Sequence, residues 1–403
     1  MFAARYREIR PARYPKPDRG RGNLTIDPSK DLPNLATCTT CRFKEDKSNY
    51  WTAVLYFKHP NGSYIRVNQM ANHNTGPGLQ TGGITVYYFQ PYQNFTIFPK
   101  GFRTTVGGAR RRANDIDPSN PSSRATSFRC FGTNPDDLGD NSPGWGSTDS
   151  FDFPKQPCPA GIRSNIYFPQ CWDGVNLDSA DHQTHVVHPE ADAISGNSFF
   201  NTPCPASHPV RLPVLFLEII WDTRPFNDPE LWPKDGTQPF VFSMGDPNGF
   251  GQHADYVFGW EGDSLKRAME QCTGGTGVPW DCPALSLQDM DTMNECRAPI
   301  KVEEVVEGKY LDKLPGCNPI QAGPESATIV PDCTAASTTI DGPVPTAPPA
   351  ITPPWTVCDP AATPNPVPII PNCNAYPGPT TAFTASPIPT LPPKAEVPLE
   401  HEA

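Results

Sequence analysis

The chain has 403 residues and a formal net charge of −11, and its 52 prolines and 31 glycines are spread unevenly along it. The negative charge argues against a nucleic-acid-binding surface as the main function, because phosphate neutralisation needs clustered lysine and arginine. No apolar run reaches the roughly eighteen residues of a membrane-spanning helix, so the sequence predicts no membrane span. A hydrophobic content of 37% indicates a compact part diluted by a non-globular one.

The first part of the chain, residues 1–34, is basic and proline-bearing without periodicity, which predicts a disordered arm. It contains no apolar h-region, so it is not a secretory signal peptide. Thirteen cysteines and the glycosylation sequons at Asn23, Asn61 and Asn94 nevertheless point to an oxidising, secretory compartment. We therefore expect that the N-terminus is misassigned or truncated, and that at least one cysteine has no partner within the chain.

Cys38 and Cys41 have the spacing of a CxxC pair, which occurs in zinc sites and in disulfide-bonded proteins. A second CxxC at a suitable distance does not follow. The sequence therefore favours disulfide bonding for these cysteines.

Strand patterns begin after this pair. Residues 51–57 and 63–67 are rich in β-branched and aromatic side chains, and residues 59–62 between them have the composition of a hairpin turn. Residues 84–89 and 95–98 continue the pattern at short spacing. The sequence predicts an antiparallel sheet here.

Residues 99–165 are poor in periodicity, which predicts long loops that are held by disulfides at Cys130 and Cys158. The run Arg110-Arg111-Arg112 inside them suits either a proteolytic processing site or a solvated loop, and short basic runs favour the loop. Taken together, the patterns predict a mostly β domain over residues 35–312, an antiparallel β-sandwich or jelly-roll-like fold with long, disulfide-pinned loops.

The stretch from Cys171 to Glu190 concentrates acids and histidines in a segment too polar for a core. Imidazoles and carboxylates together either ligate a metal or share the donation and acceptance of protons. The sequence leaves both chemistries open. The residues concerned are Asp173, Asp178, Asp181, His182, His185, His188 and Glu190.

The apolar run from Pro213 to Trp221 predicts a buried strand that contains one acid, Glu218. On the two-residue period of a strand, Glu218 and Asp222 point to the same side. An ionised carboxylate in an apolar sheet needs a partner. We weigh a salt bridge to Arg211 or Arg224 equally with a catalytic role.

Two further strands, 240–244 and 254–260, flank a glycine-containing loop that His253 and Asp255 close. A helix follows, for which Ser264 is the expected N-terminal cap. Its expected apolar face is formed by Leu265, Ala268, Met269 and Cys272.

Residues 313–403 are rich in proline and threonine, which predicts a disordered, extended tail. Within it, one cysteine-bounded unit occurs twice. We expect two small disulfide loops, Cys317 with Cys333 and Cys358 with Cys373, on a mucin-like stalk.

Several blocks, NLTIDP, CTTCRFKEDKSNYW, FPQCWDGVNLDSADHQTHVVHP, CPASHPVRLPVLFLEIIWDT and FSMGDPNGFGQHADYVFGW among them, resemble the fungal secreted proteins of domain-of-unknown-function family 1996 (DUF1996). The resemblance covers roughly residues 23–320. It implies a secreted protein associated with the cell wall or with biomass, with an unassigned activity. It also implies a signal peptide and a His-X-His segment that this sequence lacks, since no histidine precedes His59.

From these observations we expect a polysaccharide-acting protein outside the cell. A hydrolase needs two carboxyl groups across the scissile bond, and Asp181 and Glu218 are the leading pair, whereas a lyase needs a base and a proton donor. The alternatives are a non-catalytic carbohydrate-binding or structural wall glycoprotein, and a metal site at His182 and His185. No cofactor is expected. The candidate catalytic residues are His182, His185, Asp181, Glu218, His253 and Asp255, and the candidate substrate-binding residues are Trp172, Asp173, Trp221, Asp222 and Trp260.

Overall fold

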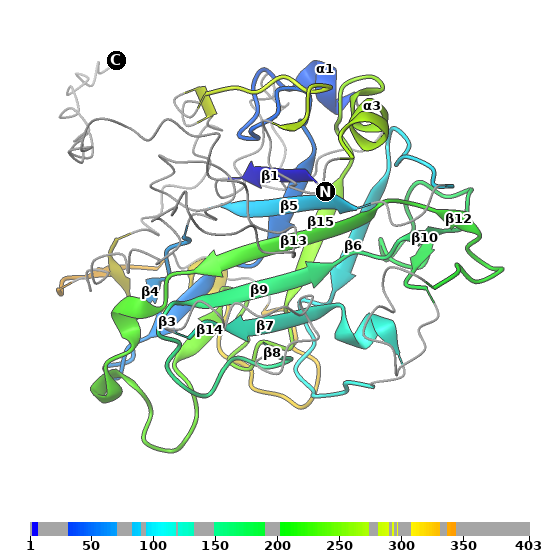
Figure 1. The fold of residues 1–403 in the computed structure, drawn as a ribbon. Helices are drawn as coiled ribbons and strands as arrows, with labels where there is room; N and C mark the ends of the chain where they lie inside the picture. Colours follow the sequence, from blue (N-terminus) through cyan, green and yellow to red (C-terminus); the bar gives the residue numbers. More distant parts are fainter. Residues whose placement is uncertain are drawn as a thin grey trace, which may run out of the picture. The chain divides into compact units, whose positions relative to one another are not determined.

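Two antiparallel sheets stacked face to face form the centre of the structure, a computed structural model (Figure 1). The buried side chains between the sheets belong to one continuous hydrophobic core. The structure describes residues 2–6, 31–70, 83–89, 94–117, 120–132, 149–189, 202–273, 281–289, 292–293, 296, 308–330 and 337–343.

The larger sheet has six strands in the order β1-β5-β13-β9-β7-β8, and every neighbouring pair is antiparallel. Side chains alternate between its two faces, as the strand period requires. On β13, Leu217 and Ile219 point into the core, while Phe216 and Glu218 point to the outer face. The strands are β1 (Phe2–Tyr6), β5 (Ile84–Phe89), β7 (Thr126–Cys130), β8 (Asp149–Ser150), β9 (Ile162–Tyr167) and β13 (Val214–Trp221).

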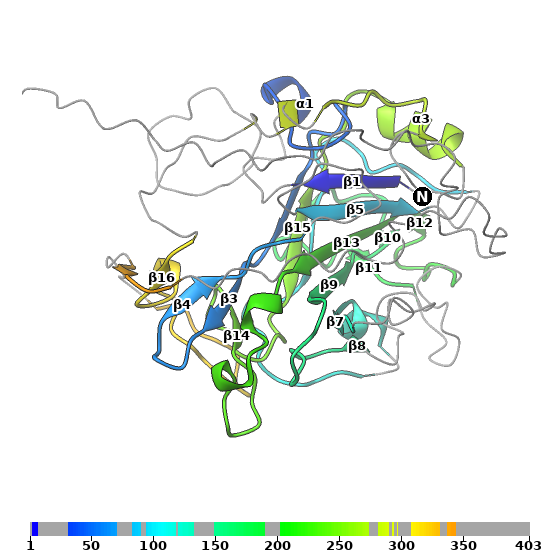
Figure 2. The same cartoon turned by 60° about the vertical axis from the view of Figure 1, so that its left-hand side comes forward.

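The second layer is a three-stranded sheet in the order β2-β15-β6, with β2 at Asn49–Thr52, β15 at His253–Val257 and β6 at Arg103–Gly107. In Figure 1, β15 and β6 cross behind the larger sheet, and Figure 2 shows β15 near β5 and β13 in the turned view. Hydrogen bonds join the layers: the Tyr88 hydroxyl lies 2.6 Å from that of Tyr50 and donates to that of Tyr256 at 3.1 Å.

Two smaller sheets extend the sandwich. The order of one is β14-β3-β4-β16-β17 and that of the other is β11-β10-β12. Their strands are β3 (Leu55–Lys58), β4 (Tyr64–Arg66), β10 (Cys171–Trp172), β11 (Val186–Val187), β12 (Val210–Arg211), β14 (Phe240–Phe242), β16 (Tyr310–Leu311) and β17 (Thr339–Ile340). The α-helices are α1 (Leu32–Leu35) and α3 (Ser264–Gln271), and single 3-10 turns lie at Pro121–Arg124, Arg224–Phe226, Pro229–Leu231 and Pro315–Cys317.

Disulfides hold the long loops; one joins residues 258 positions apart in the sequence, and three others join residues 10 to 33 positions apart. The bonds are Cys38–Cys296, Cys130–Cys158, Cys171–Cys204 and Cys272–Cys282. Four disulfides fit an extracellular protein. Cys41 departs from the expectation for the CxxC pair, because it keeps a buried thiol that faces Asp46 Oδ2 at 3.6 Å.

The mostly β, antiparallel fold confirms the class expected from the sequence. The predicted hairpin is present, with β3 paired to β4 and Gly62 in the left-handed region at a φ of 90°. Residues 95–98, however, are not a strand: Pro99 follows them, and one backbone bond, from Thr96 N to Arg211 O, ties them to a neighbour.

The single predicted helix of the later chain, α3, is present, and its expected apolar face is buried. The N-cap residue is Asp263 rather than Ser264, which is already helical and buried. None of the described helices is long and apolar enough to span a membrane.

Residues 308–330 lie against the β-domain, so the boundary expected at 312 falls inside a packed segment. Arg112 Nε donates to Gln321 O, and Ala327 N donates to Arg110 O, each at 2.8 Å. The expected arm lies almost wholly outside the described residues. The same is true of the proposed tail loops, that is Cys333, Cys358, Cys373 and the side chain of Cys317.

Candidate functional site

Glu218 lies on the outer face of the six-stranded sheet, and both of its carboxylate oxygens have a bonding partner. Arg163 of β9 lies 2.8 Å from its Oε1, and the Tyr87 hydroxyl donates to its Oε2 at 2.7 Å. The partner is thus Arg163, not Arg211 or Arg224. Asp222 is the residue that binds Arg224, through two bonds of 2.7 and 2.9 Å. Both carboxylates are buried in ion pairs that explain their place in the fold.

The three tryptophans expected to bind sugar are instead parts of the interior. Trp172, Trp221 and Trp260 are 9%, 1% and 2% exposed. Their indole N–H groups donate to Asn176 O, Ser164 Oγ and Tyr88 Oη respectively. A sugar stacks on an open ring face, and none of these rings offers one. Their role as substrate platforms is therefore corrected to that of core aromatics.

In the acid-rich loop, Asp173 and Asp181 shape the backbone. Asp173 Oδ1 accepts the N–H groups of Val175 and Asn176. Asp181 Oδ1 accepts the N–H groups of Thr184 and Gln183 as well as the Ser179 hydroxyl, and these bonds hold the pKa of Asp181 far below its usual range. Such a carboxyl is a poor proton donor. The expected pair of Asp181 with Glu218 also does not meet, because Glu218 lies on the opposite outer face from the sheet that this loop borders.

His185 and His188 point inward. His185 Nδ1 lies 2.9 Å from Ser179 Oγ, and its ring packs against Phe102. Burial lowers the pKa of His185, and it lowers the pKa of His188 to about 4, so both rings are neutral at physiological pH. Neither imidazole is available at an open surface. Glu190 lies outside the described residues.

His182 stands apart from these neighbours because it is half-exposed and bonded to a carboxylate. Its Nδ1 lies 2.6 Å from Asp178 Oδ1. Its backbone adopts a left-handed φ of 59°, which is uncommon for a side chain with a Cβ and is found more often at functional sites. The Thr105 N–H donates to His182 O at 2.8 Å, so the loop lies along the edge of β6.

Together with this loop, the outer surface of the β2-β15-β6 sheet forms what we term the β15 face. Register places Asp255 between Trp51 of β2 and Thr105 of β6, and places His253 opposite Gly107. Gln183 joins the loop to β6 through bonds of 3.0 Å to Thr105 Oγ1 and 2.9 Å to Gly107 O. The β15 face consists of Trp51, Arg103, Thr105, His182, Gln183, His253 and Asp255.

Asp255 is the electrostatic centre of the β15 face. Burial raises its pKa, against the opposing effects of His253, Arg103 and His182. Its carboxyl makes no hydrogen bond with the described residues, unlike those of Asp178, Asp181 and Glu218. The structure therefore brings together three of the candidate catalytic residues, His182, His253 and Asp255.

His253 is held in a defined orientation. Its Nδ1 lies 2.7 Å from Gly251 O, and a carbonyl oxygen only accepts, so Nδ1 carries the hydrogen and Nε2 of the neutral ring has the lone pair. Burial lowers the pKa of His253, which favours this neutral form. The ring lies against the indole of Trp51, with centroids 5.0 Å apart, and Trp51 is 38% exposed.

A metal at His182 and His185 finds no support in this geometry, because one ring is at the surface and the other packs into the core. Within the described ranges, no group of three or more His, Cys, Asp or Glu side chains is arranged to hold a metal ion.

Four parts of the site were not revealed by the sequence: Trp51, Arg103, Thr105 and Gln183. Trp51 follows the core residue Tyr50, so strand alternation alone would have placed it on the outer side once Tyr50 was assigned to the core. Arg103 and Gln183 join the site only through the pairing of β6 with β15 and with the loop, which is a long-range feature.

The comparisons with known proteins agree with the resemblance in sequence. A family profile described as "Domain of unknown function (DUF1996)" matches residues 20–260, which is 241 of the 403 residues and includes every residue of the β15 face. No curated protein and no solved structure matches the chain. The chain belongs to the DUF1996 family.

Proposed function

We propose that the protein is secreted and cleaves polysaccharide at the β15 face by transferring protons between Asp255 and His253. The observation that carries this proposal is the half-buried carboxyl of Asp255, set between imidazoles beside an exposed indole. Burial raises the pKa of the Asp255 carboxyl and lowers that of the His253 imidazole, which moves each toward the form that acid–base catalysis requires, a protonated acid and a neutral base.

Asp255 is the proton donor in this proposal, since burial favours its protonated form. His253 is the base, because its Nδ1 is occupied by Gly251 O and its Nε2 is left with a lone pair. His182 presents the same nitrogen, Nε2, since its Nδ1 is bonded to Asp178. Two oriented imidazoles and one carboxyl thus supply both directions of proton transfer.

Trp51 is the sugar platform. An open indole face stacks on the C–H surface of a sugar ring, which explains why exposed tryptophan is useful on an otherwise polar surface. Three inter-strand spacings of about 4.8 Å each separate β2 from the loop, across β15 and β6. The face is therefore about 14 Å wide, which suits a chain of several sugars rather than a single one.

The groups present favour elimination over hydrolysis by two carboxyl groups. In an elimination, the base takes a proton from a ring carbon, the electron pair of that C–H bond forms a C=C bond, and the neighbouring C–O bond breaks. The leaving oxygen takes the proton from the acid. His253 and Asp255 meet these two needs, whereas the second carboxyl near them, Asp178, is engaged by His182.

Binding without cleavage is the second candidate function. It is favoured by the openness of the site, because the β15 face is the surface of a sheet and most catalytic sites lie in clefts. Exposed Trp51 and the hydrogen-bonding groups of Thr105 and Gln183 would serve a lectin equally well.

The test combines a binding measurement and a cleavage measurement on the full chain with a panel of wall polysaccharides. We expect that Trp51→Ala lowers affinity by about tenfold, which is the lower part of the range for loss of an aromatic stacking contact. Asp255→Asn should bind normally but release product at least about 100-fold more slowly. Product is measured as reducing ends and as the ultraviolet absorbance of an unsaturated sugar.

Two exposed residues away from the face provide matched controls. Ile329→Ala removes an exposed apolar side chain, and Glu270→Gln removes an exposed carboxyl on α3; neither should change binding or cleavage. If binding depends on Trp51 but the wild-type protein releases no product, cleavage is excluded and binding without cleavage is the function that is supported. If no polysaccharide binds, or if Trp51→Ala binds as the wild-type does, the proposal is wrong.

A further inference from the structure

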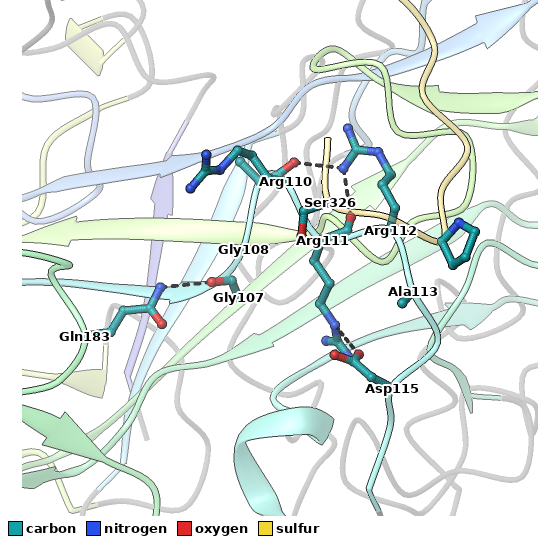
Figure 3. Close-up of a pocket in the computed structure, with 11 residues that line it drawn as sticks. Gly107, Gly108, Arg110, Arg111, Arg112, Ala113, Asp115, Gln183 and Ser326 are labelled. Carbon is teal, nitrogen blue, oxygen red and sulfur yellow. Dashed lines mark hydrogen bonds and ion pairs between the residues drawn. The ribbon is translucent and has the colours of Figure 1, made fainter. Parts of the chain in front are cut away.

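A pocket of about 410 Å³ opens beside the β15 face, where β6 ends. Gly107 and Gln183 line it, and the same two residues border His253, by strand register and through the loop that carries His182. Figure 3 shows Gln183 donating to Gly107 at one side and the arginine run at the other. A ligand that lies on the β15 face therefore reaches this pocket without crossing another element.

The three arginines of the pocket differ in their bonding. Arg112 is buried, and its guanidinium is taken up by four backbone carbonyls, those of residues 109, 111, 244 and 321. Arg111 forms an ion pair with Asp115, which neutralises the one carboxylate in the lining. The sequence-based expectation of a uniformly solvated loop thus fails at Arg112, which anchors the run to the domain.

Arg110 remains with its charge uncompensated. Its side chain is exposed, and no acidic group of the described residues forms an ion pair with it. In Figure 3 it extends away from Arg111 and Arg112. The backbone beneath it is fixed, since Arg110 O accepts the N–H of Ala327 at 2.8 Å. A guanidinium on a fixed backbone beside a cavity is a binding group for carboxylate, which it contacts through two parallel N–H donors.

We propose that this pocket binds the carboxylate of an acidic sugar, so that the polysaccharide recognised at the β15 face is a polyuronate; this inference rests on the proposed function. The pocket volume lies within the range of small-ligand sites. An acidic substrate also fits the proposed chemistry, because a ring C–H next to a carboxylate is acidified once that carboxylate is paired with a cation. The chain as a whole carries −11, so a local cationic group is needed to attract an anionic polymer.

The experiment measures binding of the full chain to four oligosaccharides of equal length by calorimetry: an oligogalacturonate, its methyl ester, a sulfated oligosaccharide and a neutral gluco-oligosaccharide. We expect that the oligogalacturonate binds at least about tenfold more tightly than its methyl ester, and that Arg110→Gln removes this difference. Raising the ionic strength should weaken only the binding of charged ligands.

Two further variants separate charge from shape. Arg267→Gln removes an arginine from α3 and should leave the preference for acid unchanged, which excludes an effect of net charge alone. Gly108→Leu keeps Arg110 but fills the pocket; a Cβ at Gly108 meets only Arg111 Cβ, at 3.8 Å, so the backbone accepts it. Gly108→Leu should lower oligogalacturonate affinity by about tenfold and affect the neutral ligand less.

The outcomes distinguish the two proposals. Equal binding of the acid and its methyl ester, or a preference that survives Arg110→Gln, overturns the acidic-sugar inference and leaves the β15 face as a glycan site. Tighter binding of the sulfated ligand than of the oligogalacturonate overturns the assignment to carboxylate. No binding of any ligand refutes the proposed function itself, and this inference with it.

Discussion

The two outer faces of the sandwich each present a carboxyl group on a central strand, and the two groups are held differently. Glu218, on β13, lies between Arg163 and the Tyr87 hydroxyl and is buried. Asp255, on β15, has nearby positive groups but no hydrogen bond within the described part of the chain. One carboxyl is part of a closed network, and the other is half-buried on the outer face of its sheet.

This difference shows why a charged residue in a strand is weak grounds for a catalytic role. Both residues lie on strands of the domain, Glu218 within the apolar run of β13 and Asp255 between Ala254 and Tyr256 on β15. What separates them is whether the surrounding side chains complete the bonding of the carboxyl. At Glu218 they do, so its role in the fold is stability; at Asp255 the described side chains do not, and burial raises the pKa of its carboxyl.

The largest expected effect is the loss of stability when the ion pair of Glu218 with Arg163 is removed. Glu218→Ala leaves the mostly buried Arg163 without its partner and should lower the free energy of unfolding by about 3–5 kcal/mol, measured in urea. Glu218→Gln still accepts the Tyr87 hydrogen bond and should lose less. Cleavage per folded molecule should stay at the wild-type level in Glu218→Gln, and a fall of tenfold or more would place Glu218 in the active site.

A third carboxyl, Asp46, lies in the core between the two faces and sharpens the comparison. Burial raises the pKa of Asp46 to about 6. Because the folded-state pKa exceeds the unfolded one, this group stabilises the fold fully below about pH 4, and the contribution is lost as the pH rises through about 6. We expect a decline of up to about 3 kcal/mol over that window. Asp46→Asn should lack this decline when unfolding is measured from pH 4 to pH 7, and an unchanged slope would contradict the assignment.

Activity should depend on pH through the β15 face alone. The pKa of Asp255 is raised and that of His253 is lowered, both mainly by burial. The rate of cleavage should therefore fall as the pH drops through the His253 pKa and the base becomes protonated, and fall again as the pH rises through the Asp255 pKa and the acid loses its proton. Each limb approaches about tenfold per pH unit. A profile that is flat between pH 4 and pH 8 would show that these groups do not carry the proton transfer.

The smallest expected effect concerns the stability of the Asp255 variant. Since burial disfavours the ionised form of Asp255, Asp255→Asn should make the protein slightly more stable at pH 7, in contrast to any change at Glu218. Thermal unfolding measures this difference. A clear loss of stability would mean that Asp255 has a structural partner after all.

Sequence patterns predicted those elements that are determined by residues close together in the chain. The hairpin of β3 and β4 and the strands β5 and β13 follow from alternation and turn composition, which neighbouring residues determine. The failure at residues 95–98 has a local cause in Pro99, but it also reflects the lack of a partner strand, which no local pattern shows.

The site was predictable only in part, for the same reason. His253 and Asp255 are two residues apart, so a shared face follows once the strand is assigned. The convergence of His182 with them depends on the bond from Thr105 N to His182 O, which joins positions far apart in the chain. The density of histidines in the loop led to a wrong prediction, because His185 and His188 are buried in the interior and do not join the site.

The most direct test of the central claim is an NMR titration of the full chain with an oligosaccharide that it binds, following the tryptophan indole and histidine ring signals. If the β15 face is the site, the signals of Trp51, His182 and His253 should shift together and saturate at the same ligand concentration. Those of the buried Trp221 and Trp260 should remain in place. Shifts at the buried residues, with Trp51 and His253 unchanged, would contradict the account.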